Sequence, residues 1–121
     1  HLIRSISQNN KLKTTNIPES IDLIHLDDLI DAIFSLLNSN NTNGKVLNIG
    51  SGSPTKVIKI IKLVYKARKL NFNDNIKYDL RLKKGQFYPD IKKISKLIGW
   101  KKKKNVFINL SKIAKSFNIT A

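Results

Sequence analysis

The spacing of apolar residues along this chain changes several times, and these changes restrict its fold more than any other feature. Short runs of strand-forming residues are predicted at 11–15, 21–26, 45–49 and 76–80. Between and after them, apolar residues recur every three or four positions, as they do in helices. The predicted order is helix, strand, strand, helix, strand, helix, strand, helix, helix, with the first helix ending within residues 1–10. This order is typical of α/β or α+β proteins.

The predicted helices differ in how much of their surface is apolar. In the helix expected at about 29–37, apolar side chains cover a broad face, so we expect it to be largely buried. Asp27 and Asp28 stand at its first turn, where carboxylates accept backbone N–H groups and suit the helix dipole. The helix expected at about 54–69 has apolar residues on one side and lysines on the other. Ser53 is its predicted N-cap, with proline at the first helical position.

The last third of the chain contains two more predicted helices. Residues 81–89 are expected to be irregular, because a glycine lies in their middle. Asp90 is the predicted cap of a short helix, and Gly99 ends it at the position where glycine is favoured. Trp100 can then fold back onto that helix end. The lysine run that follows is expected to be a surface loop, before a final helix at about 106–117.

The composition excludes several classes of protein. At 121 residues the chain is expected to be a single segment, 1–121, and its 40% hydrophobic content suits a packed core rather than disorder. It contains no cysteine, which excludes a disulfide framework, a cysteine zinc site and a thiol nucleophile. No apolar run is long enough to span a membrane. The chain starts at His1 and contains no methionine, so we expect a processed or excised segment.

The net charge of +15 suggests a nucleic-acid partner, but the type of basic residue argues against one. Lysine accounts for 20 of the 23 basic residues. Lysine, asparagine and isoleucine share AT-rich codons and together supply 52 of the 121 residues, so genome bias can raise the lysine count. Proteins that read nucleic acids favour arginine for bidentate contacts. A solvated lysine surface is therefore favoured, and a small basic nucleic-acid-binding module is the alternative.

Two short motifs resemble cofactor or catalytic signatures without completing them. Gly50-Ser51-Gly52 follows a predicted strand, but Thr55 stands where a dinucleotide-binding loop has its third glycine. A structural turn is the favoured interpretation. Tyr65 and Lys69 have the Y-x-x-x-K spacing of short-chain dehydrogenases, yet they lie in a segment with a lysine at every third or fourth position. Chance explains that pair better.

Four acidic residues in the first third of the chain have two possible roles. Paired carboxylates can bind a metal ion or act in acid–base chemistry, but capping of a buried helix is favoured. His25 lies beside them in an apolar segment and is interpreted as a structural residue. Two histidines, His1 and His25, are too few for a histidine metal site. The four acidic residues are Asp22, Asp27, Asp28 and Asp31.

Three segments, taken together, resemble a known family. Residues 21–32, IDLIHLDDLIDA, are similar to the R-D-F-I-H-V-D-D-x-x-x-A segment of NAD-dependent epimerases/dehydratases, the extended short-chain dehydrogenases/reductases that act on nucleotide sugars. Residues 46–52, VLNIGSG, resemble V-Y-N-I-G-S-G in the same enzymes. Residues 87–101, FYPDIKKISKLIGWK, resemble D-x-S-K-x-x-x-x-L-G-W-x-P. The three segments occur in the family's order and at its spacing.

This resemblance covers nearly the whole chain and implies the C-terminal portion of an extended Rossmann-type α/β fold. The N-terminal half of such an enzyme, with its dinucleotide-binding glycine loop and catalytic Tyr-x-x-x-Lys, has no match here. The resemblance therefore implies NAD or NADP in the intact enzyme, no cofactor bound by this segment alone and no catalytic or metal-ligating residue within it. Residues 48–52 would join the edge of the dinucleotide-binding sheet, and the later helices would form the substrate lobe.

The resemblance also implies one substrate-binding residue. An arginine before the D-x-S-K helix often holds the substrate's phosphates in this family, and Arg81 is the corresponding residue here. Lys83 and Lys84 would add positive potential for an anionic diphosphate. The chain departs from the family at Ile21, where an arginine is usual, at Gln86, where aspartate is frequent, and at Lys102, where proline is usual.

The expected function is that of the substrate-binding part of a cytoplasmic isomerase or lyase of carbohydrate biosynthesis. Its expected partners are a nucleoside-diphosphate sugar and the missing dinucleotide-binding part, with a homodimer as a further arrangement of the intact enzyme. No membrane is expected among the partners, and nucleic acid is disfavoured. Besides the nucleic-acid-binding module, a truncated and inactive remnant is the other alternative.

Overall fold

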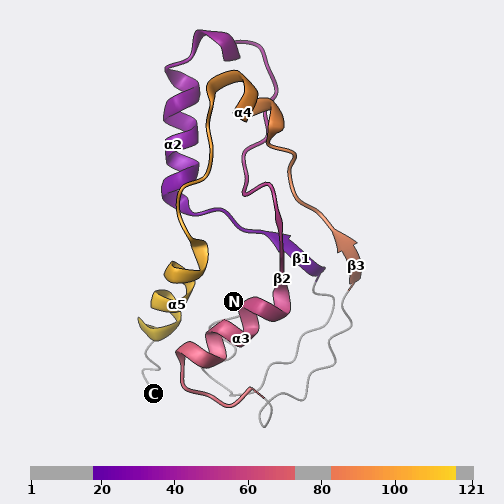
Figure 1. Cartoon of the computed structure of the whole chain (residues 1–121), viewed down its shortest axis with the longest axis vertical. Coiled ribbons are helices and arrows are strands. Elements are labelled where there is room, and N and C mark those ends of the chain that lie inside the picture. The colour runs from indigo at the N-terminus through magenta and orange to yellow at the C-terminus, as the bar shows by residue number, and fades with distance from the viewer. Residues whose placement is uncertain (1–17, 73–82, 117–121) are drawn as a thin grey trace. The chain divides into compact units, whose positions relative to one another are not determined.

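A computed structural model describes residues 18–72 and 83–116 of the chain (Figure 1). The described residues form a small α/β arrangement of short strands and helices. The strands are β1 (Pro18–Asp22), β2 (Pro54–Lys56) and β3 (Lys83–Gln86). The helices are α2 (Leu26–Leu37), α3 (Val57–Ala67), α4 (Lys92–Ile98) and α5 (Val106–Ser116), with a short 3-10 turn η1 (Asn40–Thr42).

The three strands form one sheet in the order β2-β1-β3. Strand β1 runs parallel to β3, with Pro18 opposite Lys83 and Ser20 opposite Gln86, and the register shifts between these two pairs. A parallel pair requires a long crossover between its strands, and here the crossover includes α2 and α3. The predicted α/β class is therefore confirmed for the described residues.

The sheet uses different residues from those predicted. The strand expected at 21–26 overlaps β1 only at the last two residues of β1, because the chain leaves the strand early to begin α2 at Leu26. The predicted strand at 45–49 is not part of any ladder in the described portion of the chain. Residues 83–86, expected to be irregular, form β3 instead. A strand needs a hydrogen-bonding neighbour, and local sequence does not specify which segment supplies it.

The chain divides into two compact units. The second unit comprises Ile21–Thr55 and Phe87–Val106. Its core contains Ala32 from α2, Ile94 from α4 and Trp100, all of them buried. Partly buried apolar side chains surround this core, namely Ile24, Leu36, Ile49, Ile91 and Ile98.

Helix α4 and the residues after it agree with the sequence analysis. The Asp90 carboxylate accepts the backbone N–H of Lys92 over 2.8 Å, so Asp90 serves the first turn as predicted, although Ile91 occupies the N-cap position. Gly99 ends the helix in the left-handed conformation, with φ of 67°. The indole of Trp100 folds back into the core, and the Ser95 hydroxyl donates a hydrogen bond to the Trp100 carbonyl over 2.8 Å.

The other unit contains α3, which has the predicted division between an apolar and a basic side. Its buried residues are Val57, Ile60, Ile61, Val64 and Tyr65, while lysines occupy its exposed positions. The predicted N-cap is wrong, because Pro54 and Thr55 belong to β2 and the helix begins only at Val57. The N-cap position is held by Lys56, whose side chain makes no capping hydrogen bond.

Helix α2 differs most from the sequence analysis. We expected it to be largely buried, but only Asp28 and Ala32 are buried. Phe34 is 62% exposed and Leu37 is 76% exposed. Helix α2 does have the predicted broad apolar face, but within the described residues only one side of that face packs against other residues.

Helix α5 begins at Val106 as predicted and is helical as far as the described residues extend, to Ser116, with Ala114 buried. The predictions for residues 1–10, 11–15 and 76–80 lie outside the described residues. Among 18–72 and 83–116, no helix combines the length and the apolar character that a membrane span requires.

Candidate functional site

The turn after residue 49 is held by an aspartate from the end of β1. The two carboxylate oxygens of Asp22 accept the backbone N–H of Ser51 over 2.9 Å and the Ser51 hydroxyl over 2.6 Å. The same hydroxyl contacts the Ser53 carbonyl at 2.8 Å and accepts the Ser53 N–H at 3.2 Å. Ser51 is buried. Asp22 and Ser51 therefore fix the shape of this turn.

The two glycines of the turn are required by close packing. A Cβ on Gly50 would overlap the ring of Pro89 and lie 2.7 Å from an Asp22 oxygen. A Cβ on Gly52, whose φ is +70°, would lie 2.7 Å from the Ile91 side chain. The chain's own residues therefore fill the space that a phosphate-binding loop leaves open for its ligand.

This turn does not suit the pyrophosphate of a dinucleotide cofactor. A phosphate-binding turn offers free backbone N–H groups to an anion, whereas here the Ser51 N–H is bonded to a carboxylate. The negative charge of Asp22 would also repel a phosphate. The interpretation of Gly50-Ser51-Gly52 as a structural turn agrees with this geometry.

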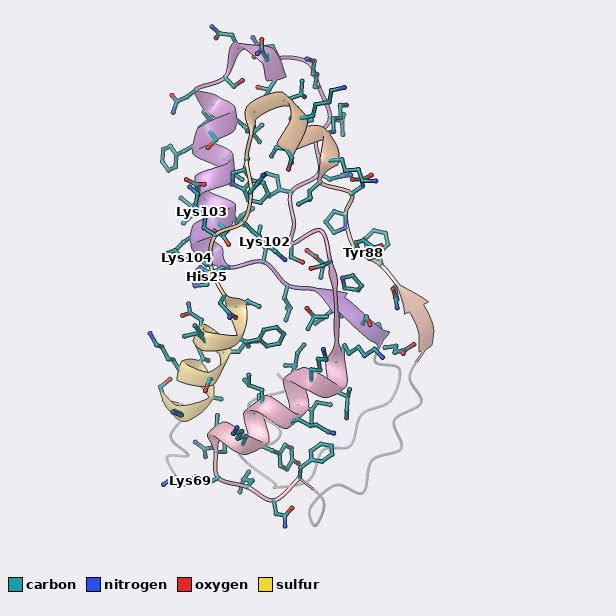
Figure 2. The ribbon with its side chains drawn as sticks, viewed as in Figure 1. His25, Lys69, Tyr88, Lys102, Lys103 and Lys104 are labelled. Carbon is teal, nitrogen blue, oxygen red and sulfur yellow. The ribbon has the colours of Figure 1, made fainter. Side chains whose placement is uncertain are left out.

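A pocket of about 430 Å³ lies beside this turn. Tyr88 presents a partly exposed ring on the segment before α4 (Figure 2). Asp90 and Lys92 add a carboxylate and an ammonium group. An aromatic ring can pack against one face of a small polar ring. The neighbouring charged groups can then form hydrogen bonds with the hydroxyl groups of that polar ring. The lining residues are Gly52, Tyr88, Pro89, Asp90, Ile91 and Lys92.

The acidic residues at the start of α2 fix a distant loop. The buried carboxylate of Asp28 accepts the backbone N–H groups of Lys103 and Lys104, with one contact of 3.0 Å to each. The Lys103 ammonium lies 3.3 Å from Asp31, and the Lys104 ammonium lies 3.9 Å from Asp27. Figure 2 shows both lysines beside the first turns of α2.

The role predicted for Asp28 is therefore partly wrong. It accepts backbone N–H groups as expected, but they belong to the loop before α5 rather than to its own helix. His25 provides the cap instead: it is the N-cap residue of α2, and its Nδ1 accepts the Asp27 N–H over 3.1 Å. The interpretation of His25 as a structural residue agrees with this geometry. Among the described residues, no group of three histidine or acidic side chains could hold a metal ion.

The other residues singled out from the sequence lie in different surroundings or outside the described residues. Arg81, the predicted phosphate-binding residue, lies outside the described residues. Tyr65 is fully buried, and burial raises the pKa of its hydroxyl above the ordinary value. Lys69 lies beyond the end of α3 in a left-handed conformation and is exposed (Figure 2). Tyr65 and Lys69 thus do not form one accessible face, as a catalytic pair would.

The contacts of Asp22 and Asp28 with distant segments were not predicted. Asp22 bonds to a residue 29 positions later, and Asp28 bonds to residues 75 and 76 positions later. The available signal was weak. Both aspartates lie among apolar residues in a basic chain, which indicates a specific partner without identifying it.

The fold resembles parts of several solved structures. One is RMD from Pseudomonas aeruginosa in complex with NADPH, with a TM-score of 0.75 and 21% identity over 95% of this chain and 41% of that one. Another is UDP-glucuronic acid 4-epimerase from Bacillus cereus in complex with NAD, with a TM-score of 0.72 and 25% identity over 91% of this chain and 35% of that one.

A third similar structure is dTDP-glucose 4,6-dehydratase from Bacillus anthracis in complex with NAD. Its TM-score is 0.67 at 17% identity, over 95% of this chain and 38% of that one. This chain therefore spans about two fifths of the length of these enzymes, and the likeness shows that it has part of a Rossmann-like fold. No protein-family model matches the sequence. No curated protein matches it either.

Proposed function

We propose that this chain is the C-terminal, substrate-binding part of an NAD(P)-dependent nucleotide-sugar epimerase or dehydratase. The main support is that nearly the whole chain follows about two fifths of several such enzymes, at TM-scores from 0.67 to 0.75. The three sequence segments resembling that family occur in its order. A likeness in fold combined with ordered motifs is more specific than either one alone.

In this proposal, the part binds the diphosphate of a nucleoside-diphosphate sugar through Arg81. The arginine fork matches phosphate oxygens, and Lys83 and Lys84 add positive charge nearby in sequence. The pocket beside Tyr88 adds an aromatic surface of the kind that suits a polar ring. The part of the enzyme without a counterpart in this chain would bind the dinucleotide cofactor, NAD or NADP, and carry out the hydride transfer.

Calorimetric titration of the chain with UDP-glucuronic acid, UDP-glucose and dTDP-glucose tests this proposal. We expect binding of at least one of them, weakened by about tenfold or more in Arg81→Ala, because a charge-assisted contact to phosphate is lost. Lys59→Ala is the matched control: it removes one positive charge from the exposed side of α3 and should leave the affinity unchanged. Equal weakening by both variants would reject a specific role for Arg81.

The basic surface supports nucleic-acid binding as the second candidate. The exposed positions of α3 carry lysines, and the whole chain has a net charge of +15. This candidate predicts binding to any duplex or single strand, with an affinity that falls steeply as salt rises. Tight and salt-sensitive binding of an oligonucleotide, combined with no response to any nucleotide sugar, would favour it over the enzyme part.

A further inference from the structure

Asn43 and Gly44 form the centre of an exposed turn in the loop that follows α2. The turn runs from Thr42 to Lys45, and the backbone N–H of Lys45 donates to the Thr42 carbonyl over 3.1 Å. Asn43 has φ of −56° and ψ of 131°, and Gly44 has φ of +68°. These are the angles of a type II turn, whose third residue needs a positive φ. The geometry of the turn therefore requires a glycine directly after Asn43.

Asn43 differs from every other asparagine of the chain in the residue that follows it. The chain contains 14 asparagines, and each of the others precedes a residue that has a side chain. Such a side chain shields the backbone nitrogen of its own residue, whereas glycine leaves that nitrogen accessible and the backbone free to rotate. Asparagine is also one of the thermolabile residue types. Asn43 is therefore the asparagine whose side chain the next backbone nitrogen can most easily approach.

The surroundings of Asn43 leave its side chain free to react. Asn43 and Gly44 are both exposed, and a Cβ placed on Gly44 would meet no atom within 4 Å. Among the described residues, the Asn43 side-chain amide has no hydrogen-bond partner. Asn48 provides a contrast within the same loop, because its amide donates to the Asp90 carbonyl over 3.4 Å and the branched residue Ile49 follows it.

We propose that Asn43 is a modification site, at which the chain deamidates by itself and forms isoaspartate. The Gly44 backbone nitrogen attacks Cγ of Asn43, and the side-chain amide group leaves as ammonia with the proton of the Gly44 N–H. One water molecule then opens the resulting five-membered succinimide ring by breaking one of its two C–N bonds. Cleavage at the side-chain carbonyl gives aspartate, and cleavage at the backbone carbonyl gives isoaspartate. The attack is favoured because both reacting groups lie in neighbouring residues of one chain.

The reaction requires the turn to open, because closing the ring needs rotation about the Cα–C bond of Asn43 away from ψ of 131°. Two hydrogen bonds span the turn. One is the backbone contact from Lys45 to Thr42, and the other is an exposed contact of 2.6 Å from the Lys45 ammonium to the Asn41 carbonyl. Segments with few contacts and exposed hydrogen bonds open at a low free-energy cost. The folded chain should therefore react more slowly than a free peptide, but still at a measurable rate.

The modification changes both the charge and the backbone of this loop. Either product replaces the neutral amide of Asn43 by a carboxylate, and isoaspartate also adds one methylene group to the backbone. The loop leads to Ile49, which packs against the core of the second unit. The isoaspartyl carboxylate is the group that a carboxyl methyltransferase recognises. In that transfer a methyl group passes from the sulfonium of S-adenosylmethionine to a carboxylate oxygen and leaves S-adenosylhomocysteine.

Incubation of the 121-residue chain in mildly alkaline buffer tests the proposal, with digestion and fragment mass spectrometry to follow each asparagine. We expect Asn43 to deamidate about tenfold or more faster than Asn48, because glycine leaves the attacking nitrogen accessible. An isoaspartyl methyltransferase with labelled S-adenosylmethionine should label the incubated chain. Asn43→Gln should lose this label, since ring closure by the longer side chain is slower. Asn48→Gln makes the same change at the second position and should keep the label.

Three results would overturn the proposal. The first is deamidation of Asn43 and Asn48 at equal rates. The second is an unchanged Asn43 over the time in which a synthetic peptide of residues 42–47 converts, which would show that the folded turn does not open. The third is a methyl label that persists in Asn43→Gln, which would assign the isoaspartate to another residue. None of these measurements involves a nucleotide sugar, so the modification site and the proposed function are tested independently.

Discussion

The aspartates of this chain show how single carboxylates join distant segments. Asp22 bonds to Ser51, and Asp28 bonds to the backbone of Lys103 and Lys104. In both cases a carboxylate accepts the backbone N–H of a residue that lies outside helices and strands. Hydrogen bonds to charged groups contribute more than neutral ones, and removing one partner leaves the other unsatisfied.

Replacing Asp22 by asparagine tests this at the scale of one residue. Asp22→Asn keeps the shape of the side chain but places an N–H₂ group against a donor at Ser51. We expect the free energy of unfolding to fall by about 1–3 kcal/mol, measured by urea denaturation followed by circular dichroism. Asp31→Asn is the control: it breaks a surface pair with Lys103 and should cost about 0–1 kcal/mol. Equal losses would show that the Asp22 contact is not special.

Among the elements, the burial of α3 was predicted well and the burial of α2 was not, for one reason. The buried positions of α3 follow its apolar period, because the residues that cover them are within this chain. The same relation between apolar period and burial predicted the burial of α2 wrongly, because an apolar side indicates that a helix is covered but does not identify the covering residues. The predicted strand boundaries were wrong for a similar reason, since strand pairing depends on a non-local neighbour.

The buried tyrosine of α3 gives this element a pH dependence. Burial raises the pKa of the Tyr65 hydroxyl above its ordinary value of about 10. The unfolded chain therefore loses this proton at lower pH than the folded chain does. The stability due to neutral Tyr65 is fully present below about pH 10 and is lost as pH rises toward the folded-state pKa.

We expect Tyr65→Phe to remove this part of the alkaline destabilisation. Urea midpoints should fall less between about pH 8 and about pH 11 for the variant than for the parent chain. At about pH 8 the variant should be equally stable or up to about 1 kcal/mol more stable, because the hydroxyl has no hydrogen-bond partner among the described residues. Tyr88→Phe, at a partly exposed ring, should follow the parent chain. An identical pH profile for Tyr65→Phe and the parent would contradict this account.

For the molecule as a whole, basic side chains far outnumber acidic ones, which leaves a net charge of +15. Lysines that face water repel one another, and this repulsion opposes the compact state. We expect the thermal midpoint to rise when sodium chloride increases from about 10 mM to about 0.5 M, because the screening length shortens from about 30 Å to a few ångströms. Calorimetric scans across this range measure the effect. A midpoint that falls with salt would mean that attractive ion pairs outweigh the repulsion.

The sequence by itself determined the helical periods of α3, α4 and α5 and the glycine stop at Gly99, because these depend on residues within a few positions of each other. It also indicated a turn at Gly50-Ser51-Gly52. Only the tertiary structure decided that Asp22 holds that turn, which segments pair in the sheet, and that one side of α2 is exposed. Those outcomes depend on which distant residues meet, and periodicity shows that a surface needs a partner without identifying it.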